Sequence, residues 1–381
     1  MGGADATQAV RSGAAGAEAG QGAQATKRVG VVGASGILGG ELLRLLLGHP
    51  GLEIEYVSAQ SKAGRPATEL NPHLKDAGLG DFEAFDAASA AKRCDVVFVA
   101  TPPETAGRAV PELLDAGAEL VIDLSPAYRL RDPERHREWY PDVERDQELA
   151  EQAVYGLPEL NRAALADARV IAMPGCFATA ILLAALPLRE IDGITYDAIA
   201  VDGKSGSTGS GARLRESGAH TWRANVVAPY APRGHRHVPE VRQALGEHGV
   251  ASNGSPPRLG MSTYGVDLVR GLSVGLYSFF EGELDERTLR RAYHRTYRDE
   301  HFVRVQVGRG SALPLPDPKA VVGSNFCDVA AFVDQSVGRF VLIAAIDNLV
   351  KGGSGQALQA CNVALGFPER QGLEALPVFP V

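Results

Sequence analysis

Two patterns of hydrophobic and polar positions divide the chain. In the first part, short apolar runs at 94–100 and 119–124 are typical of strands buried on both faces, and the stretch 104–116 between them has helical spacing. Alternation of such strands with helices predicts an α/β fold with a parallel, doubly wound sheet.

Beyond residue 176 the apolar runs give way to longer stretches in which apolar and polar positions alternate. This alternation predicts antiparallel strands in a second domain of the α+β type. The stretches concerned are 198–202, 268–280 and 339–346. A final apolar-striped helix is predicted at 356–365, where it can pack back onto the first domain.

A glycine turn at 33–39 joins the first strand, at 28–33, to a leucine-rich helix at 41–47. The spacing GxxGxxG between a strand and a helix predicts the opening of a dinucleotide-binding βαβ unit, with the pyrophosphate on the helix N-terminus. A plain tight turn is the alternative.

The end of the second strand, at 52–57, indicates which dinucleotide binds. An NAD site carries an acidic residue here, whereas this chain has hydroxyls and the cations Lys62 and Arg65. That composition favours the 2′-phosphate of NADP; a solvated polar loop is the alternative. Thr101, Pro102 and Ser125 follow later strands and are expected to line the cofactor cleft.

Cys176 follows a Pro-Gly turn and precedes the apolar run 181–188. A cysteine near a helix N-terminus is favoured as a thiolate, and a thiolate is a nucleophile near neutral pH. The alternative is a small buried hydrophobic residue.

Three polar segments accompany this cysteine. His235 and His237 lie in Arg-Gly-His-Arg-His at 233–237, where histidine can transfer protons and arginine can hold an anion; a charged surface turn is the alternative. The glycine- and hydroxyl-rich loop 203–211 can wrap an anion or serve as a linker. The segment 347–355 indicates a site edge or a capping turn.

Composition narrows the class of protein. The 381 residues are 45% hydrophobic and 22% charged, with a net charge of −8, which argues against nucleic-acid binding. The four cysteines form no CxxC or Cys/His cluster, so we expect no metal site and no disulfide framework. No apolar stretch reaches about 18 residues, so no membrane span is expected. Residues 1–26 lack a signal-peptide pattern, which predicts a disordered extension of a cytoplasmic protein.

Taken together, these motifs resemble one family. The segment 174–180, Pro-Gly-Cys-Phe-Ala-Thr-Ala, resembles the active-site signature of N-acetyl-γ-glutamyl-phosphate reductases. Similar segments cover about residues 27–378, at 33–36, 123–126, 155–159, 234–240 and 346–352.

The resemblance implies a domain organisation. It comprises an NADP-binding Rossmann domain at 27–175 completed by 348–381, and a catalytic and oligomerisation domain at 176–347 of the semialdehyde dehydrogenase type. It also implies NADPH as cofactor and a homo-oligomer, a dimer or a tetramer.

The implied reaction reduces an acyl phosphate through a thioester on Cys176, with His235 or His237 as the acid/base. Cofactor contacts are expected from Gly33, Ser35, Gly36, Ile37, Leu38, Ser58, Ser61, Lys62, Arg65, Thr101, Pro102, Ser125, Ser205, Gly206 and Asn348. Substrate contacts are expected from Arg129, Glu159, Ser207, Arg213 and Arg236.

Two branches of the family differ in substrate. The main expectation is N-acetyl-γ-glutamyl phosphate, in arginine biosynthesis. The alternative is an aminoadipate- or glutamate-type phosphate attached to a small acidic amino-group carrier protein, in lysine biosynthesis. Phe177-Ala178 and the segment 315–319 resemble this second branch. Local arginines can receive an acidic carrier or serve the substrate phosphate; they are Arg213, Arg215, Arg223, Arg233 and Arg236.

Two further functions stay open. An aspartate-semialdehyde or phosphorylating aldehyde dehydrogenase would share the fold, although the segment 235–240 argues against it. A non-enzymatic NADP-binding sensor would keep the fold with an inert Cys176.

Overall fold

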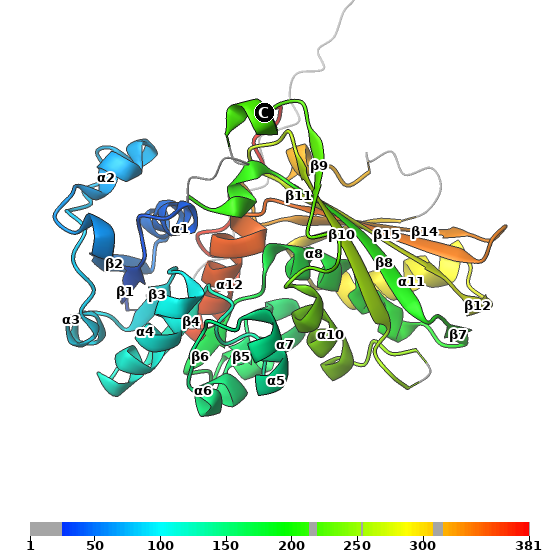
Figure 1. The fold of residues 1–381 in the computed structure, drawn as a ribbon, viewed down its shortest axis with the longest axis horizontal. Helices are drawn as coiled ribbons and strands as arrows, with labels where there is room; N and C mark the ends of the chain where they lie inside the picture. Colours follow the sequence, from blue (N-terminus) through cyan, green and yellow to red (C-terminus); the bar gives the residue numbers. More distant parts are fainter. Residues whose placement is uncertain (1–24, 213–218, 253, 308–314, 381) are drawn as a thin grey trace, which may run out of the picture.

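The computed structural model describes residues 25–212, 219–252, 254–307 and 315–380. Two main sheets lie side by side, and helices pack against each of them (Figure 1). The predicted disorder of residues 1–26 falls almost entirely outside these ranges, as do Arg213 and Arg215. Within the described ranges, no helix is long and apolar enough to cross a membrane.

The first sheet has six parallel strands in the order β2-β1-β3-β4-β6-β5, which confirms the predicted doubly wound α/β sheet. Its strands are β1 (Lys27–Val32), β2 (Leu52–Ser58), β3 (Val96–Val99), β4 (Leu120–Asp123), β5 (Val154–Tyr155) and β6 (Val170–Ala172). The chain crosses from β2 to β3 over β1, so the strand order reverses at β1. Ligands bind at the carboxyl ends of strands on either side of such a reversal.

Helices cover both faces of this sheet, which explains why a central strand such as β3 is apolar throughout. Val96 and Phe98 of β3 face a core built with α1 (Ile37–Leu47), whereas Val97 and Val99 face a core built with α3 and α4. The other helices of this part of the chain are α2 (Ala67–Leu70), α3 (Ala87–Arg93), α4 (Pro103–Asp115), α5 (Pro133–Trp139), α6 (Gln147–Gln152) and α7 (Pro158–Leu165).

The second sheet has seven strands in the order β13-β14-β15-β11-β8-β10-β9. They are β8 (Ala198–Ser205), β9 (Val227–Tyr230), β10 (Arg258–Val266), β11 (Leu272–Phe279), β13 (Val303–Val307), β14 (Cys327–Asp334) and β15 (Arg339–Ile346). A separate two-stranded ribbon pairs β7 (Ile194–Thr195) with β12 (Glu281–Gly282).

Strand direction confirms the prediction for the three strands that it named. Strands β8, β11 and β15 are antiparallel neighbours, whereas two strands that were not predicted, β10 and β13, run parallel to β8 and β14. Alternation reports a strand with one buried face and carries no information on direction. Long connections, one of them containing α10 (Val238–Glu247), allow the parallel crossovers.

Helix α8 (Cys176–Ala185) is buried on all sides from Phe177 to Ala185, because it lies beneath the second sheet and contacts β11, β14 and β15 (Figure 1). Helix α11 (Glu286–Tyr297) covers the same face, whereas Phe279 on β11 is 68% exposed. The last helix, α12 (Gly355–Ala364), packs against α1 and α7, and a short α9 (His220–Arg223) precedes β9.

Candidate active site

Cys176 is the first residue of α8, and Gly175 is its N-cap without any side-chain cap. The ring of His237 lies directly over Gly175: a Cβ at position 175 would stand 2.3 Å from His237 Nε2. Only glycine therefore allows this approach. On another side, a Cβ at Gly352 would stand 2.7 Å from the Cβ of Cys176, so the backbone at 352 contacts the cysteine directly.

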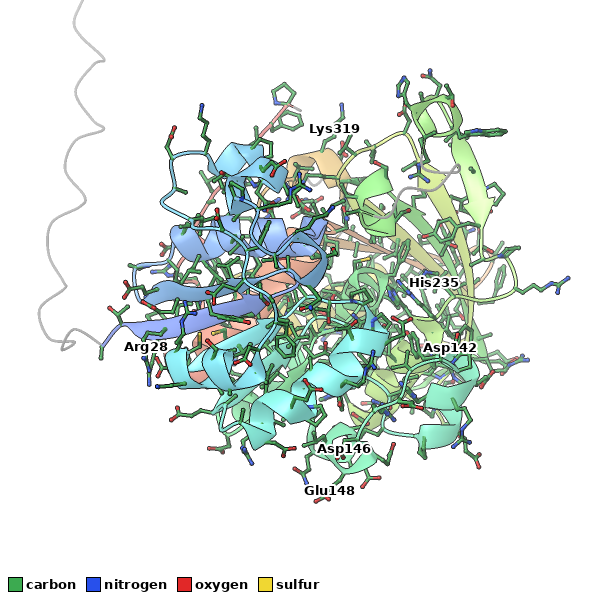
Figure 2. The ribbon with its side chains drawn as sticks, turned by 60° about the vertical axis from the view of Figure 1, so that its left-hand side comes forward. Arg28, Asp142, Asp146, Glu148, His235 and Lys319 are labelled. Atoms are coloured by element: carbon green, nitrogen blue, oxygen red, sulfur yellow. The ribbon has the colours of Figure 1, made fainter. Side chains whose placement is uncertain are left out.

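The structure brings both predicted histidines to the Cys176 turn. Their ring centroids are 4.5 Å apart at an angle of 83°, and the backbone N–H of His237 donates to His235 Nδ1 (3.2 Å). His235 packs edge-on against Phe177 at 5.4 Å and is half-buried; it is labelled in Figure 2. His237 is buried, and its ring is the one that lies over the turn.

Neither histidine carries a proton readily in this environment. Burial and the neighbouring Arg236 lower the pKa of His235 to about 4. Burial, His235 and Arg129 lower the pKa of His237 well below its usual value. Both rings are therefore neutral at pH 7, and a neutral imidazole can accept a proton from a thiol.

The thiol of Cys176 is less acidic than its helix position alone predicts. Burial raises its pKa, although the Phe177 N–H and the charges of Arg129 and Arg236 act in the opposite direction. Formation of the thiolate therefore needs a proton acceptor, and a neutral imidazole, such as that of His237 over the turn, is chemically able to accept a proton.

Arg129, which we expected to bind substrate, lies beside the Cys176 turn, and its contact with substrate stays a prediction. Its guanidinium is buried and donates to Met173 O (2.6 Å), to Leu124 O (3.1 Å) and to Glu240 Oε1 (3.3 Å). The guanidinium is thus engaged inside the protein. Residue type alone cannot distinguish such an arginine from one that holds an anionic ligand.

Glu240 is the main residue that sequence reasoning missed. Its buried carboxylate accepts hydrogen bonds from Tyr155 OH (2.9 Å) and from the Gly175 N–H (3.2 Å), and its Oε1 is 3.8 Å from His237 Nε2. Both Tyr155 and Glu240 lie in segments that carried the family resemblance. The spacing of His237 and Glu240, three apart at the start of a helix, was the available signal.

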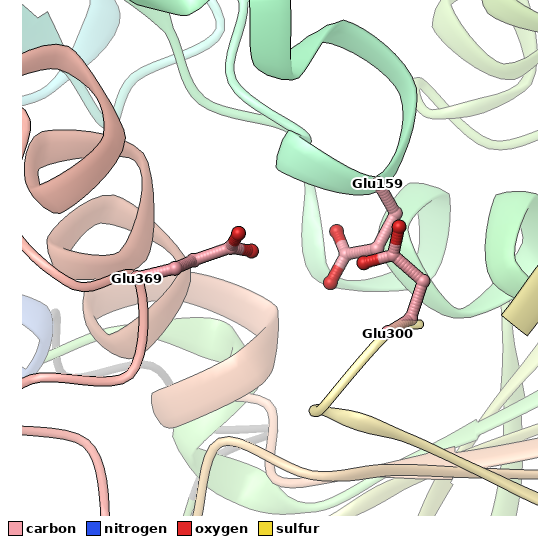
Figure 3. A group of neighbouring side chains, drawn as sticks. All are labelled: Glu159, Glu300 and Glu369. Atoms are coloured by element: carbon pink, nitrogen blue, oxygen red, sulfur yellow. The ribbon is translucent and has the colours of Figure 1, made fainter. Parts of the chain in front are cut away.

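Glu159, which we expected to contact substrate, lies in a buried ion pair, and its contact with substrate stays a prediction. Its side chain is 1% exposed, and Oε1 accepts from Lys351 Nζ (2.6 Å) and Gln359 Nε2 (3.0 Å). Glu300 and Glu369 bring their carboxylates to the same place (Figure 3). Arg162 donates to both of them, so two cations of the chain, Lys351 and Arg162, are paired with these three carboxylates.

The glycine turn lies where β1 and β3 end side by side. Gly33 has a φ of +85°, and a Cβ there would stand 2.8 Å from the carbonyl carbon and oxygen of Ala100. Ser35 and Gly36 come next along the chain. Helix α1 then begins with Ile37 and Leu38, and no side chain caps its N-terminus. An uncapped helix N-terminus after such a turn is suited to a pyrophosphate.

The neighbouring residues that were predicted to contact the cofactor differ in whether their polar groups already have a partner in the protein. Ser58 and Thr101 each have a buried hydroxyl without a hydrogen-bond partner among the described residues. Ser125 is tied to Asp123, with Oγ 2.9 Å from Oδ2. Arg65 is paired with Glu69 at the surface. Ser61 and Pro102 are exposed, and Lys62 is half-buried.

One segment connects the cysteine with the glycine turn. Residues Val350–Ser354 form a π-helix in which Gly352 contacts Cys176, whereas Ser354 Oγ donates to Leu38 O (2.8 Å). Asn348 precedes it and holds two loops, because Oδ1 accepts from the Gly271 N–H (2.8 Å) and Nδ2 donates to Thr208 Oγ1 (3.0 Å). The glycine turn and Cys176 are thereby held close to each other.

The remaining predicted residues lie around this place. Ser205 and Gly206 are buried at the end of β8, with the Gly206 N–H bound to Gly271 O (2.9 Å), and Ser207 is half-buried. Arg236 is exposed. Arg213 lies outside the described residues.

Two domain profiles of one family match most of the chain. The semialdehyde dehydrogenase NAD binding domain matches residues 28–168, and the semialdehyde dehydrogenase dimerisation domain matches residues 176–348.

Relatives of similar length carry a common name. The [LysW]-L-2-aminoadipate/[LysW]-L-glutamate phosphate reductase of Saccharolobus solfataricus is 37% identical over 353 residues, which are 93% of this chain and 98% of that protein. A Nitrosopumilus maritimus protein, which bears the same name as a provisional assignment, is 39% identical over 93% of this chain and 100% of its own length.

Solved structures with the same fold are aspartate semialdehyde dehydrogenases. The Candida albicans enzyme with NADP has a TM-score of 0.65 at 17% identity, over 90% of this chain and 99% of that one. The Vibrio cholerae enzyme II complexed with ASA has a TM-score of 0.65 at 15% identity, over the same shares. At these identities the likeness concerns the fold alone.

Proposed function

Because the chain belongs to the semialdehyde dehydrogenase family, we propose that it is a reductase of carrier-bound acyl phosphates. The reaction converts an aminoadipate- or glutamate-type acyl phosphate, attached to an amino-group carrier protein, into the semialdehyde with release of phosphate. Of the two substrates expected from the sequence, the names of the relatives favour the carrier-bound one over N-acetyl-γ-glutamyl phosphate. The observation that carries the proposal is Cys176 at the N-terminus of α8, next to Gly175, over which the ring of His237 lies.

In this mechanism, neutral His237 accepts the proton of Cys176, and the thiolate attacks the acyl carbon. The carbon–oxygen bond to phosphate breaks, phosphate leaves, and a thioester forms on Cys176. NADPH, when bound, supplies the hydride that reduces this thioester. Backbone N–H groups at the start of α8 stabilise the oxyanion, and the carbon–sulfur bond then breaks to give the aldehyde and the thiolate.

The residues around the glycine turn fit a dinucleotide. Gly33 in the left-handed region allows the backbone to approach a pyrophosphate, and the uncapped N-terminus of α1 offers N–H groups to it. Two buried hydroxyls without partners among the described residues, on Ser58 and Thr101, lie at the ends of β2 and β3 on this edge. We propose Lys62 and Arg65 as the residues that hold the 2′-phosphate, with Arg65 exchanging its surface partner Glu69.

An acidic carrier is the proposed partner, and its receptor is the arginine rim formed by Arg233 and Arg236. Both side chains are exposed beside His235, and neither forms an ion pair with any residue that the structure describes. A hollow of about 520 Å³ lies alongside, between Trp139, Gly234 and β10. Unpaired cations at the rim of a site attract an anionic partner and raise its rate of association.

A homo-oligomer, a dimer or a tetramer, is proposed to form through the second sheet. One face of that sheet is covered by α8 and α11, whereas Tyr277 and Phe279 of β11 are exposed on the other. The match to a dimerisation domain over the same residues supports this assignment.

The reverse reaction gives the sharpest test. NADP⁺ reduction at 340 nm is followed with phosphate and either the carrier-bound semialdehyde or free N-acetylglutamate semialdehyde, using wild type and Cys176→Ala. We expect a Cys176-dependent rate with the carrier-bound semialdehyde only. An equal or greater rate with the free compound would return the enzyme to arginine biosynthesis, and a rate that survives Cys176→Ala would exclude the thioester mechanism.

A further inference from the structure

The carboxylate of Glu240, which we did not expect to contact cofactor or substrate, lies at the centre of the site. Glu240 is 1% exposed and lies beneath the Gly175–Cys176 turn. Burial of a charge is costly, and a buried ion pair seldom stabilises a protein more than apolar residues of the same shape. Fold stability alone therefore does not account for Glu240.

The contacts of Glu240 join three parts of the chain. Oε2 accepts from the Gly175 N–H at the start of α8 (3.2 Å) and from Tyr155 OH at the end of β5 (2.9 Å). Oε1 accepts from Arg129 (3.3 Å), which in turn holds the carbonyl of Met173 just before the turn (2.6 Å). The backbone on both sides of Pro174 is thus fixed by one buried network.

The same carboxylate faces the ring that lies over the turn. Glu240 Oε1 is 3.8 Å from His237 Nε2, whereas His237 Nδ1 has no partner among the described residues. The other charged or titratable groups that act on this ring are Arg129, Arg236 and His235. Glu240 is the one anion beside them, and an adjacent anion stabilises an imidazolium when it forms.

We propose that Glu240 is a positioning residue for the reductase reaction: it holds the Cys176 turn and the His237 ring together and stabilises the imidazolium formed when Cys176 loses its proton. Arg129 and Tyr155 hold Glu240 in turn. This inference rests on the proposed function for its chemistry, but the pairing of thiol and imidazole is measurable without any substrate.

The negative charge of Glu240 acts on Cys176 in two opposite ways. Acting directly, it raises the pKa of the thiol. Acting through His237, it favours the thiolate–imidazolium pair and makes the thiol more reactive. Glu240→Gln removes the charge and keeps the shape, so the sign of its effect on Cys176 distinguishes a positioning residue from a mere neighbouring charge.

The test is the rate of alkylation of Cys176 by iodoacetamide between pH 5 and 9 in the full-length protein, located by mass spectrometry. The other cysteines, Cys94, Cys327 and Cys361, are buried. In Glu240→Gln we expect alkylation at pH 7 to slow by roughly 10-fold or more, the pH profile to move upward, and kcat to fall by roughly 10–100-fold. We expect KM for NADPH to stay within about threefold, since general acid–base groups act on the chemical step.

Glu247→Gln, on the same helix but paired with Arg131 near the surface, is the matched control and should change neither quantity. Faster or unchanged alkylation in folded Glu240→Gln would overturn the proposal. If that variant does not fold, Tyr155→Phe removes only one hydrogen bond to the carboxylate; alkylation should slow by about threefold, in line with one lost hydrogen bond. Unchanged alkylation in it would count equally against the proposal.

Failure of the proposed function has a different signature. If alkylation responds to Glu240→Gln but no acyl phosphate or semialdehyde is turned over, the positioning role stands and the assigned reaction falls.

Discussion

Two buried carboxylates, each paired with a cation, differ in what else they touch. Glu159 accepts from Lys351 and Gln359, and its neighbourhood is completed by side chains of the fold alone. Glu240 accepts from Arg129 and Tyr155 but also from the backbone N–H beside Cys176, and it faces His237. The comparison shows that burial of an ion pair does not by itself indicate its role. The role depends on the other groups that the two charged residues contact.

The electrostatics of the two pairs differ in the same way. Burial acts to raise the pKa of both carboxyls, but Lys351 and Gln359 reverse this for Glu159 and hold its pKa below the usual value. For Glu240 the effect of burial prevails over Arg129, so its pKa is raised. Lys351 and Gln359 therefore stabilise the charge of Glu159, although its Oε2 has no hydrogen-bond partner among the described residues, whereas Arg129 stabilises the charge of Glu240 less completely.

Removal of the nucleophile should have the largest effect and should leave both pairs intact. In Cys176→Ala the thioester cannot form, so reductase activity should fall below detection. NADPH binding, measured by fluorescence, should change by less than about twofold, because Cys176 lies outside the glycine turn. Residual turnover above one part in a thousand would contradict covalent catalysis.

Breaking the structural pair should affect stability rather than chemistry. Lys351→Met leaves Glu159 buried and unpaired, which should lower the free energy of unfolding by about 3–5 kcal/mol. The double variant Lys351→Met/Glu159→Gln should recover most of this loss. Chemical denaturation measures both, and kcat of the folded fraction should stay near that of wild type.

An exposed pair supplies the control for this experiment. Arg258 and Asp197 are paired at the surface with both side chains more than 70% exposed. Arg258→Ala should cost about 1 kcal/mol or less. A similar loss in Lys351→Met would show that the buried pair contributes no more than the surface one.

The two histidines near Glu240 should separate by role. His237 lies over the Cys176 turn and faces the carboxylate, so His237→Gln should lower kcat by about 100-fold, the lower range for a general acid–base residue. His235→Gln should lower kcat by about 10-fold or less, since the half-buried ring of His235 packs against His237 and Phe177. Single-turnover rates measure both, and the reverse order would exchange the two assignments.

The smallest effect is expected outside both pairs, at the arginine rim. Arg233→Ala/Arg236→Ala should raise KM for a carrier-bound substrate by about 10-fold at low salt and leave kcat within about threefold, because rim charges act mainly on association. The difference from wild type should shrink toward 0.5 M salt, where the Debye length is only a few ångströms. A salt-independent effect on kcat would place these arginines in the chemical step.

How much was predictable differs between the two halves of the molecule. Strands such as β3 are apolar on both faces, and the shortness of such a run favours a buried strand over a helix, so the parallel sheet could be predicted from the sequence. Strand direction in the second sheet could not be predicted, because β8 and β10 would show the same alternation in a parallel as in an antiparallel arrangement.

At the site, backbone features were easier to predict than side-chain roles. The turn before Cys176 and the glycine turn at Gly33 follow from local chemistry. Arg129 and Glu159 did not, since a charged side chain at a site can face the ligand or the protein, and only tertiary contacts decide which.

The π-helix at Val350–Ser354 has a consequence for how this molecule can be altered. Gly352 rests on Cys176 and a Cβ at Gly353 would stand 2.6 Å from Leu38, so both contacts are made by bare backbone. A bare backbone has no rotamers through which to adjust. Even alanine at either position should push Cys176 and helix α1 apart. These two glycines therefore tolerate no side chain, and the spacing of the two domains cannot be changed by substitution there.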